Sequence, residues 1–179
     1  IGKPAPWVEV KIAALDDTEL PCGEVGEIII KGWVVMEGYY KDPKTTAEVI
    51  KNGWFHTGDL GRFDEEGFLY IVGRKKDMIK VSGEIVYSFE VENVLLKHPS
   101  VQEAAVVGVP DKLRGEIVKS FVVLKKGIDI KAAEDIRLFC REHLAHFKVP
   151  HNVEIRESLP KTPSGKIQKE TLKSQNRAE

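Results

Sequence analysis

The chain has 179 residues, 42% of them hydrophobic and 31% charged. This composition is typical of a soluble globular protein of one or two domains, and no apolar run approaches the roughly 18 residues of a membrane-spanning helix. The formal net charge of −1 excludes an overall field that would attract nucleic acid. Cys22 and Cys140 have neither metal-ligand nor redox spacing, so we expect a reduced, cytoplasmic setting.

The first part of the chain, to about residue 73, has the pattern of β-structure. Val8–Ile12 and Glu27–Lys31 are short alternating or apolar runs bounded by turn residues, and they predict strands. Asp42 and Pro43 suit the N-cap and the first position of a helix. A short helix is therefore predicted over Lys44–Ile50.

A β-hairpin is predicted next. Leu60–Phe63 and Phe68–Val72 are apolar runs, and acidic residues and a glycine separate them. Just before the hairpin, in GWFHTGDLG (53–61), Asp59 stands between nearby glycines. We expect a flexible loop there, in which the Asp59 carboxylate either accepts two hydroxyl hydrogen bonds, as from a ribose diol, or closes an Asx-turn.

A domain boundary is predicted at Gly73–Asp77. A glycine followed by four charged residues makes a poor core segment. Such a segment suits a linker or a solvated turn. With a linker, the chain divides into residues 1–73 and 74–179.

Helices and strands alternate in the second part. Ser88–Lys97 has apolar residues close to helical spacing, with Ser88 as candidate N-cap and a stop at His98-Pro99. The elements predicted after it are two strands, a helix and a third strand, at Val101–Val109, Ile117–Leu124, Ile130–Leu144 and Val153–Ile155. This order indicates a compact α+β domain of about 100 residues.

A lysine near the end of the chain is placed on a turn. In LPKTPSGKIQK (159–169), Lys166 follows a Pro-Ser-Gly sequence. Pro163 fixes one backbone dihedral and Gly165 permits a positive φ, so the turn is tight and Lys166 lies on a bend. A cation held this way suits an anionic transition state on a phosphate or a carboxylate, although a solvated lysine fits the same pattern.

Two further loops carry charge. GRKKDMIKVSG (73–83) places Arg74, Lys76 and Lys80 around a bend and leads into the loop Ser82-Gly83-Glu84. DKLRGE (111–116) presents Arg114 beside a glycine. Cations grouped in this way are candidate ligands of phosphate groups.

These segments together resemble the adenylate-forming ligases. GWFHTGDLG, GRKKDMIKVSG, HLAHFKVP and LPKTPSGKIQK occur in the order and spacing of that superfamily, over essentially the whole chain. With GYYKDPKTTAEV, they are most similar to bacterial fatty-acyl-CoA ligases. The resemblance implies an α+β architecture: residues 1–73 end a large, β-rich, barrel-like N-terminal domain, and residues 74–179 form a small mobile C-terminal domain.

The resemblance implies a two-step reaction. A carboxylate attacks the α-phosphate of ATP, giving an acyl-adenylate and pyrophosphate, and the CoA thiol then displaces AMP. The first step brings anions together, at a cost of roughly 4 kcal/mol per charge pair at about 4 Å and an effective dielectric constant of ~20. Lys166 matches the catalytic lysine of this step, Asp59 the ribose-binding residue and Arg74 a second nucleotide contact. Ile71 either packs near the adenosine or belongs to the hairpin core.

The second step is matched by other residues. Lys76 corresponds to the hinge about which the C-terminal domain rotates between the two steps. Lys80, a second catalytic position, and the loop Ser82-Gly83-Glu84 would line the pantetheine path, and Arg114 would meet the CoA phosphates. The sequence departs from the family pattern at two positions. Ser88 replaces a usual proline, and the Glu84 anion favours a carrier-protein pantetheine over the more highly charged CoA.

Parts of the family's machinery are missing from this sequence. Its Ser/Thr/Gly-rich phosphate loop, its Mg²⁺-holding segment and its acyl pocket all lie upstream in the family. We expect the C-terminal part of a longer ligase for a medium- or long-chain fatty acid. Its cofactors would be ATP and CoA, with Mg²⁺ bound through the missing N-terminal domain and no metal site in this part. Alone, the chain would form no adenylate.

Other functions fit the same residues. The parent is alternatively an acyl-carrier-protein ligase or a peptide-synthetase adenylation domain. A different class is a non-catalytic module that binds phosphate groups through its Lys and Arg loops. The expected partners of the ligase are the small-molecule substrates and the missing domain, with no nucleic acid and no transmembrane segment.

Overall fold

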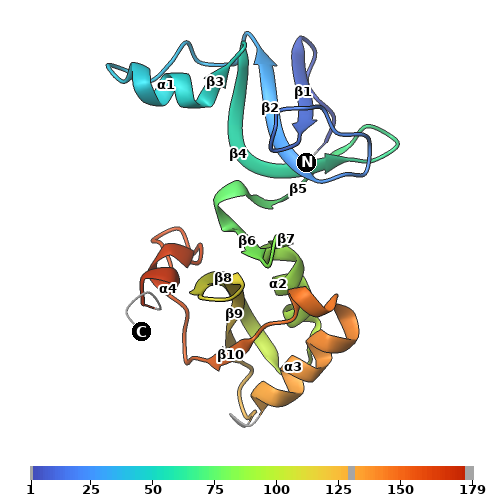
Figure 1. Ribbon diagram of the computed structural model, residues 1–179, viewed down its shortest axis with the longest axis vertical. Helices are drawn as coiled ribbons and strands as arrows, with labels where there is room; N and C mark the ends of the chain where they lie inside the picture. Colours follow the sequence, from blue (N-terminus) through green and yellow to red (C-terminus); the bar gives the residue numbers. More distant parts are fainter. Residues whose placement is uncertain (1, 129–131, 176–179) are drawn as a thin grey trace. The chain divides into compact units, whose positions relative to one another are not determined.

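The chain forms two compact units, Ile1–Lys76 and Asp77–Glu179. The computed structural model describes residues 2–128 and 132–175 (Figure 1). The units divide after Lys76, inside the glycine-and-charge segment, where a short 3-10 helix, η1 (Lys75–Asp77), forms. Each unit has its own β-sheet.

The first unit is a five-stranded sheet with antiparallel pairing throughout its order β1-β2-β4-β3. The fifth strand pairs with β4, also antiparallel. The strands are β1 (Val8–Ala13), β2 (Gly26–Gly32), β3 (Ile50–Lys51), β4 (Trp54–Phe63) and β5 (Leu69–Arg74). The helix α1 (Pro43–Val49) begins as predicted, because Asp42 Oδ1 accepts a hydrogen bond from Thr45 N at 3.0 Å.

Strand β4 is long and strongly curved (Figure 1). Its pairing register shifts against β2 and again against β5, and such irregularities bend and twist a strand. At the second shift, a Cβ on Gly61 would lie 2.7 Å from Ile28 Cδ1 and 2.8 Å from Tyr70 O, so the close approach requires glycine. The loop predicted before residue 60 is wrong, since β4 begins at Trp54.

The second unit is a mixed sheet in the order β10-β9-β6-β7, with β8 paired to β9. Its strands are β6 (Met78–Val81), β7 (Glu84–Tyr87), β8 (Val101–Asp111), β9 (Gly115–Leu124) and β10 (Asn152–Ile155). Strand β10 pairs in parallel with β9, and the other pairs among these strands are antiparallel. The helices are α2 (Ser88–Lys97), α3 (Ala132–His143), the 3-10 helix η2 (His146–Lys148) and α4 (Lys169–Gln175).

Both faces of this sheet are covered. Alternate residues of β8 and β9, such as Val106 and Val122, pack with α2 and α3 on one face. Their neighbours, such as Val107 and Phe121, pack with Leu172 of α4 on the other (Figure 1). Strands buried on both faces need continuous apolar runs, which explains why 104–109 and 121–124 have no polar side chain.

The predicted elements of the second unit are largely confirmed. The helix at 88–97 and the strands at 101–109, 117–124 and 153–155 are present, while the β6–β7 hairpin and α4 were not predicted. The helix predicted over Ile130–Leu144 covers Ala132–His143, and its first residues lie outside the described part. In the described residues, no helix is long and apolar enough to cross a membrane.

One predicted cap is wrong. Ser88 is the first residue of α2 and Tyr87 holds the N-cap position, with no side-chain cap bond. Ser88 is buried, and its Oγ accepts a hydrogen bond from Lys169 Nζ at 2.9 Å. The hydroxyl therefore serves a contact with α4 that the local sequence pattern does not reveal.

Candidate functional site

Lys166 lies at the end of a tight hairpin, residues 161–167, here called the Lys166 hairpin. Its two sides join at the bridge Lys161↔Ile167 and through the hydrogen bond from Thr162 N to Lys166 O, 2.8 Å. Gly165 has a φ of +83°, and its N–H donates to Thr162 O at 2.8 Å. The predicted turn is confirmed in this detail, because glycine supplies the positive φ that a three-residue loop needs.

The Lys166 side chain is exposed and has no hydrogen bond or ion pair with a described residue. Its backbone N–H donates to Thr162 Oγ1 at 3.2 Å, and that oxygen lies 2.8 Å from Ser164 Oγ. The backbone is thus held while the ammonium group remains available. A cation in this state can meet an incoming anion without first breaking an ion pair.

Asp59 and Arg74 face each other across strands β4 and β5 of the first unit. Arg74 Nε lies 2.6 Å from Asp59 Oδ1, with side-chain exposures of 58% and 28%. The second carboxylate oxygen of Asp59 has no partner among the described residues. Asp59 thus lies in a strand and not in the predicted flexible loop, and pairing of β4 with β5 unites two residues 15 positions apart.

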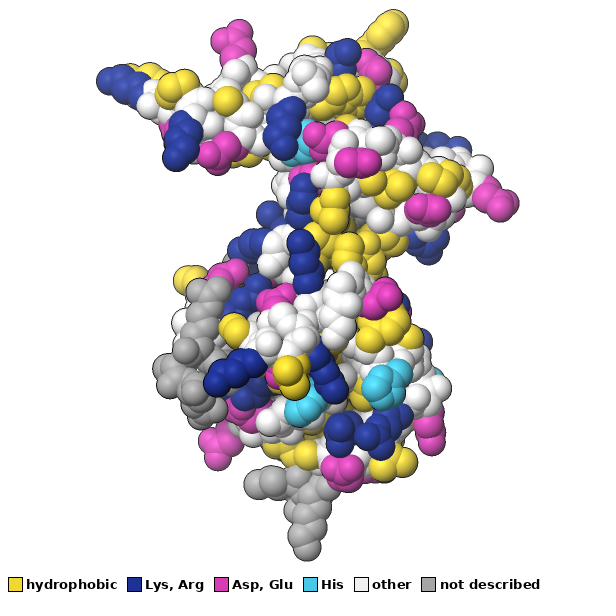
Figure 2. All heavy atoms as spheres, in the orientation of Figure 1, with side chains coloured by type: hydrophobic (Ala, Val, Ile, Leu, Met, Phe, Trp, Pro, Cys, Tyr) yellow, Lys and Arg dark blue, Asp and Glu magenta, His cyan; other side chains and the backbone are white. Residues whose placement is uncertain are grey.

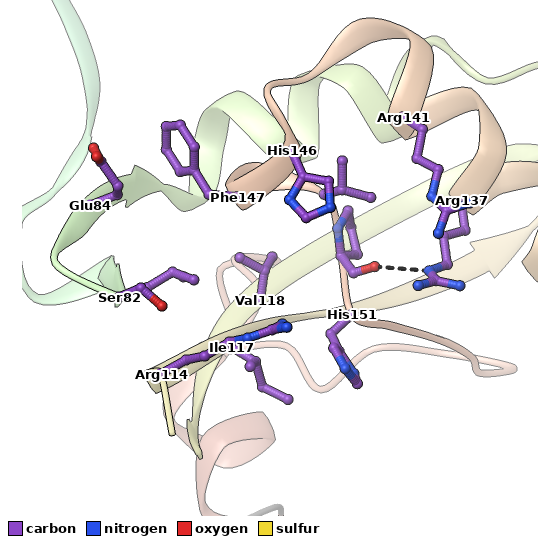
Figure 3. Close-up of a pocket in the computed structure, with 13 residues that line it drawn as sticks. Ser82, Glu84, Arg114, Ile117, Val118, Arg137, Arg141, His146, Phe147 and His151 are labelled. Carbon is purple, nitrogen blue, oxygen red and sulfur yellow. Dashed lines mark hydrogen bonds between the residues drawn. The ribbon is translucent and has the colours of Figure 1, made fainter. Parts of the chain in front are cut away.

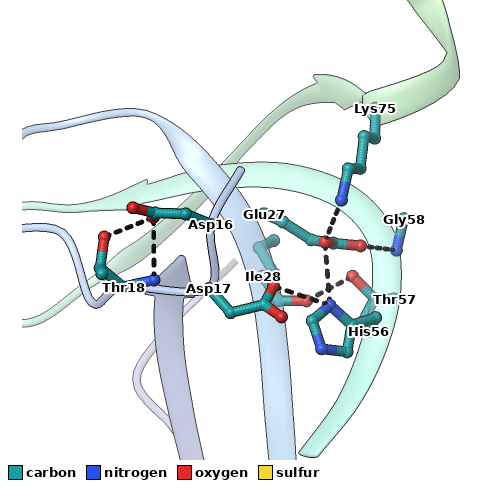
Figure 4. A network of polar contacts seen from close by, with 9 residues as sticks. All are labelled: Asp16, Asp17, Thr18, Glu27, Ile28, His56, Thr57, Gly58 and Lys75. Atoms are coloured by element: carbon teal, nitrogen blue, oxygen red, sulfur yellow. Dashed lines mark hydrogen bonds and ion pairs between the residues drawn. The ribbon is translucent and has the colours of Figure 1, made fainter. Parts of the chain in front are cut away.

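A buried polar network supports this strand pair (Figure 4). Glu27 is 4% exposed, and its carboxylate receives Lys75 Nζ at 2.7 Å, His56 Nδ1 at 3.0 Å and Gly58 N at 3.1 Å. Burial opposes ionisation of Glu27, but the contacts with Lys75, His56 and Gly58 outweigh it and hold the pKa of this carboxyl below its ordinary value. The network ties β2 to the residues flanking Asp59 and Arg74.

Gly58 shapes the backbone next to Asp59. Its φ is +71°, and Asp59 N donates to Thr57 Oγ1 at 3.0 Å. The same Thr57 hydroxyl donates to Ile28 O at 2.7 Å. This local irregularity sets the direction in which the Asp59 side chain leaves the strand.

Ile71 and Lys76 are the two other residues predicted as site residues in this region. Ile71 is 53% exposed, so the interpretation as a core residue of the hairpin is wrong and the side chain is accessible. Lys76 is the last residue of the first unit. With Gly58, Arg74 and Lys75 it lines a cavity of about 330 Å³, so three cations surround one hollow beside Asp59.

Two turns meet in the second unit. Ser82 and Gly83 have φ values of +51° and +91°, the pattern of a two-residue hairpin turn between β6 and β7. Ser82 N donates to Arg114 O at 2.8 Å, which joins this turn to the one between β8 and β9. The latter is closed by Asp111 Oδ1, which accepts from Leu113 N at 3.0 Å and Arg114 N at 2.8 Å. The predicted Ser82–Glu84 loop and Arg114 are therefore neighbours.

These turns border a cavity of about 420 Å³ in the second unit (Figure 3). Ser82, Glu84 and Arg114 of its wall were predicted as site residues from the sequence. The other charged or titratable residues of the wall were not predicted, and they come from α3 and the segment around η2. They are Arg137, Arg141, His146 and His151.

The charged groups of the cavity wall are predominantly cationic, and they lie among apolar residues such as Val118 and Phe147. Arg137 donates from Nε to Pro150 O at 3.3 Å, which orients its guanidinium, and Arg141 follows it by one helical turn. The one carboxylate in the wall, Glu84, lies at the edge on the side away from both arginines (Figure 3). Residues i and i+4 of a helix lie on one face, so the spacing of Arg137 and Arg141 was the sequence signal that could have indicated this pair.

Lys80 and Gly83 do not line this cavity. Lys80 is exposed on β6, and its backbone N–H donates to Glu116 Oε2 at 2.8 Å. A Cβ on Gly108 would lie 2.6 Å from Glu116 Oε1, so glycine there leaves room for the carboxylate. The Lys80 side chain has no hydrogen bond or ion pair with the described part of the chain.

Hydrophobic side chains lie among charged ones on the surface (Figure 2). The first unit exposes large aromatic groups, with Trp7 at 86%, Trp33 at 79% and Tyr40 at 87%. Cys140 is buried in the second unit, and burial raises the pKa of its thiol to about 11, so it is not a reactive nucleophile. No group of three His, Cys, Asp or Glu side chains suited to a metal ion occurs within residues 2–128 and 132–175.

Comparison with known proteins shows what the chain is related to. Residues 90–166 match the family described as AMP-binding enzyme C-terminal domain. Over 177 residues, 99% of this chain, the sequence is 51% identical to a long-chain-fatty-acid–CoA ligase of Escherichia coli. The chain is thus similar to AMP-binding enzymes, over residues 90–166 by the family model and over nearly its whole length by this relative. The predicted resemblance to adenylate-forming ligases is thereby confirmed.

The matches of the chain cover only part of each relative. It spans 31% of the Escherichia coli ligase and 34% of a crotonobetaine/carnitine–CoA ligase from Salmonella arizonae, to which it is 45% identical. Among solved structures, ATP-bound MatB from Rhodopseudomonas palustris superposes with a TM-score of 0.93 at 36% identity, over 99% of this chain and 35% of that one. The α+β fold class is confirmed.

Proposed function

We propose that the chain is the C-terminal part of an AMP-forming acyl-CoA ligase for a long-chain fatty acid. One observation carries the proposal: 51% identity to a long-chain-fatty-acid–CoA ligase over 99% of the chain. Residues 1–76 are then the end of the large adenylation domain, and residues 77–179 are the mobile domain, with Lys76 as hinge. The exposed Trp7, Trp33 and Tyr40 would be covered by the rest of the adenylation domain.

The geometry of the two units supports the adenylation step. A carboxylate oxygen of Asp59 is open to ribose hydroxyls, while Arg74 holds the other at 2.6 Å. Ile71, which is 53% exposed, offers an apolar contact to the adenine. Lys166 supplies a cation for the α-phosphate as the carboxylate attacks and pyrophosphate leaves. Mg²⁺ would be held by residues outside this chain.

The cationic cavity of the second unit supports thioester formation. The phosphates of CoA carry negative charge, and Arg114, Arg137 and Arg141 line a hollow of about 420 Å³. Arginine suits phosphate because its planar guanidinium can donate two parallel hydrogen bonds. Lys80 and the Ser82-Gly83-Glu84 turn would border the pantetheine arm. Glu84 is not an obstacle in this arrangement, because its carboxylate lies on the side away from Arg137 and Arg141 (Figure 3).

Substitution of Lys166 by alanine in the full-length ligase tests the proposal. We expect pyrophosphate exchange to fall by about 10²- to 10³-fold, the usual effect of removing one transition-state donor. Thioester formation from preformed acyl-adenylate should change little, because that step releases AMP without attack on a phosphate. Lys126→Ala, in an exposed turn, is the control. Equal loss of both steps, or of neither, would contradict the assigned role.

A further inference from the structure

The Lys166 hairpin is anchored at its base and open at its tip. Leu159, just before it, is 5% exposed, and Ile167 is partly buried in the same apolar cluster as Phe121. Gln168 N donates to Pro160 O at 2.8 Å and closes the base. The direction in which the hairpin projects therefore depends on how the chain is held immediately after residue 167.

That chain segment is the start of α4. The helix has only seven residues, Lys169–Gln175, too few to be stable on its own. Leu172 is fully buried against β8 and β9, which fixes one face of the helix. Lys173 Nζ also lies 3.9 Å from Asp77 Oδ1, and Gln175 Oε1 accepts a hydrogen bond from Arg156 at 2.7 Å. Both residues lie beyond the first turn of α4, so a contact nearer the hairpin is needed to set the orientation of that turn.

A partly buried ion pair supplies this contact. Lys169 Nζ lies 2.7 Å from Glu92 Oε1 and 2.9 Å from Ser88 Oγ, both on α2. The same Glu92 oxygen accepts a hydrogen bond from Val106 N of β8 at 2.8 Å. Glu92 thus connects α2, β8 and the first residue of α4.

The Glu92–Lys169 pair is more enclosed than the other pair that flanks the hairpin. Its side chains are 16% and 19% exposed, whereas those of Glu103 and Lys161 are 27% and 40% exposed. An enclosed carboxylate is costly to leave without its cation, so displacement of Lys169 is strongly disfavoured. An exposed pair exerts little such restraint.

We infer that Glu92 is a positioning residue for Lys166. By holding Lys169, Glu92 fixes the first turn of α4 and, three residues earlier, the direction in which Lys166 projects. Glu92 itself touches no substrate. The inference rests on the function proposed above, because positioning matters only if Lys166 acts in adenylation.

Glu92→Gln in the full-length ligase tests this role. Glutamine keeps the size and an oxygen acceptor for Val106 N, but removes the charge that holds Lys169. We expect adenylation to fall by about 10- to 100-fold, since small displacements of a catalytic group have effects of this size. Thioester formation from preformed acyl-adenylate should stay within a few fold, because Lys166 is not used there. Lys169→Arg keeps a cation against Glu92 and should retain adenylation.

Glu90→Gln is the matched control. Glu90 lies on the same helix and pairs with Lys148 of η2 at 2.8 Å, with side-chain exposures of 35% and 22%. The same chemical change there should leave adenylation unchanged. If Glu92→Gln fails to fold, the double variant Glu92→Gln with Lys169→Met removes both buried charges and should fold while showing the same selective loss.

Combination with Lys166→Ala separates the possible failures. If Glu92 acts through Lys166, adding Glu92→Gln to Lys166→Ala should cause no further loss of adenylation. A Lys166→Ala ligase that adenylates normally would overturn the proposed function. Loss with Lys166→Ala but none with Glu92→Gln, or equal loss of both half-reactions with Glu92→Gln, would overturn only the role of Glu92.

Discussion

Each unit of the molecule contains a carboxylate held by a lysine, and the two carboxylates behave differently. Glu27 meets Lys75 and Glu92 meets Lys169, at 2.7 Å in both cases. Yet the pKa of Glu27 is held below its ordinary value of 4.5 and that of Glu92 is raised above it. Solvent exposure predicts the opposite order, because the Glu27 side chain is 5% exposed and the Glu92 side chain 16%.

The difference lies both in how strongly burial opposes the charge of each carboxylate and in the donors that each one meets. For Glu92, burial in the protein raises the pKa more than Lys169 and Val106 N lower it, and the charge of Asp77 raises it further. Glu27 is also opposed by burial, but it has Lys75, His56 and Gly58 N as partners. The sign of a pKa shift is therefore set by the balance between lost hydration and the number of donors, and not by burial alone.

Removal of the lysine in the first unit should have the largest effect on stability. Lys75→Met leaves Glu27 buried with only His56 and Gly58 as donors, so we expect the free energy of unfolding to fall by about 2 kcal/mol, somewhat less than for a fully enclosed pair. Urea unfolding followed by tryptophan fluorescence measures this unit alone, because all three tryptophans, at 7, 33 and 54, belong to it.

A second pair in the same unit is the control. Lys11 and Glu19 also lie 2.7 Å apart, but their side chains are 37% and 59% exposed. Lys11→Met should cost at most about 1 kcal/mol, including its contact with the ring of Trp54. If Lys75→Met and Lys11→Met lower the free energy of unfolding equally, burial of Glu27 does not increase the cost of removing its lysine partner.

The two carboxylates should also give opposite pH dependence. The stability from Glu27 is present above pH 4.5 and is lost as the pH falls through its lowered native pKa. For Glu92, stabilisation is present below pH 4.5 and is lost as the pH rises through its raised native pKa. As the pH rises, the free energy of unfolding of the wild type should therefore increase relative to that of Glu27→Gln. It should decrease relative to that of Glu92→Gln.

Unfolding at a series of pH values checks these signs. Tryptophan fluorescence serves for Glu27→Gln, and hydrogen exchange of the β8 amides serves for Glu92→Gln. For each variant, the difference in the free energy of unfolding from the wild type is plotted against pH. If the two plots have slopes of the same sign, the balance between burial and donors has been wrongly assigned for one of the two carboxylates.

The smallest effects are expected from glycines with a positive φ in each unit. Gly58 and Gly165 have φ values of +71° and +83°, and a Cβ at either would have no atom within 4 Å. Alanine should thus cost only the backbone strain, about 1 kcal/mol. In the full-length ligase, Gly58→Ala should raise the KM for ATP through Asp59, and Gly165→Ala should lower the kcat of adenylation through Lys166.

Pyrophosphate exchange at varied ATP concentration measures both parameters. Gly67→Ala is the control, since its φ is +79° and a Cβ there is equally unobstructed, in a turn away from the candidate residues. A change in kinetics with Gly67→Ala as large as with the other two would mean that general strain, and not displacement of Asp59 or Lys166, is responsible.

The sequence by itself determined the features that depend on near neighbours. The Lys166 hairpin was predicted from Pro163 and Gly165, and the start of α1 from Asp42, because a turn or a cap is decided within a few residues. The apolar runs of β8 and β9 predicted strands for the same reason. The resemblance to adenylate-forming ligases also followed, since ordered motifs are a property of the chain alone.

Only the tertiary structure decided which distant residues meet. Asp59 was predicted in a loop because two glycines flank it, but pairing with β5 makes the segment a strand and places Arg74 against it. Ser88 matched an N-cap pattern, yet Lys169 binds its hydroxyl. The cavity that includes Arg137 and the partly buried Glu92–Lys169 pair likewise join separate elements. Such contacts arise from packing between elements, for which local propensity carries no information.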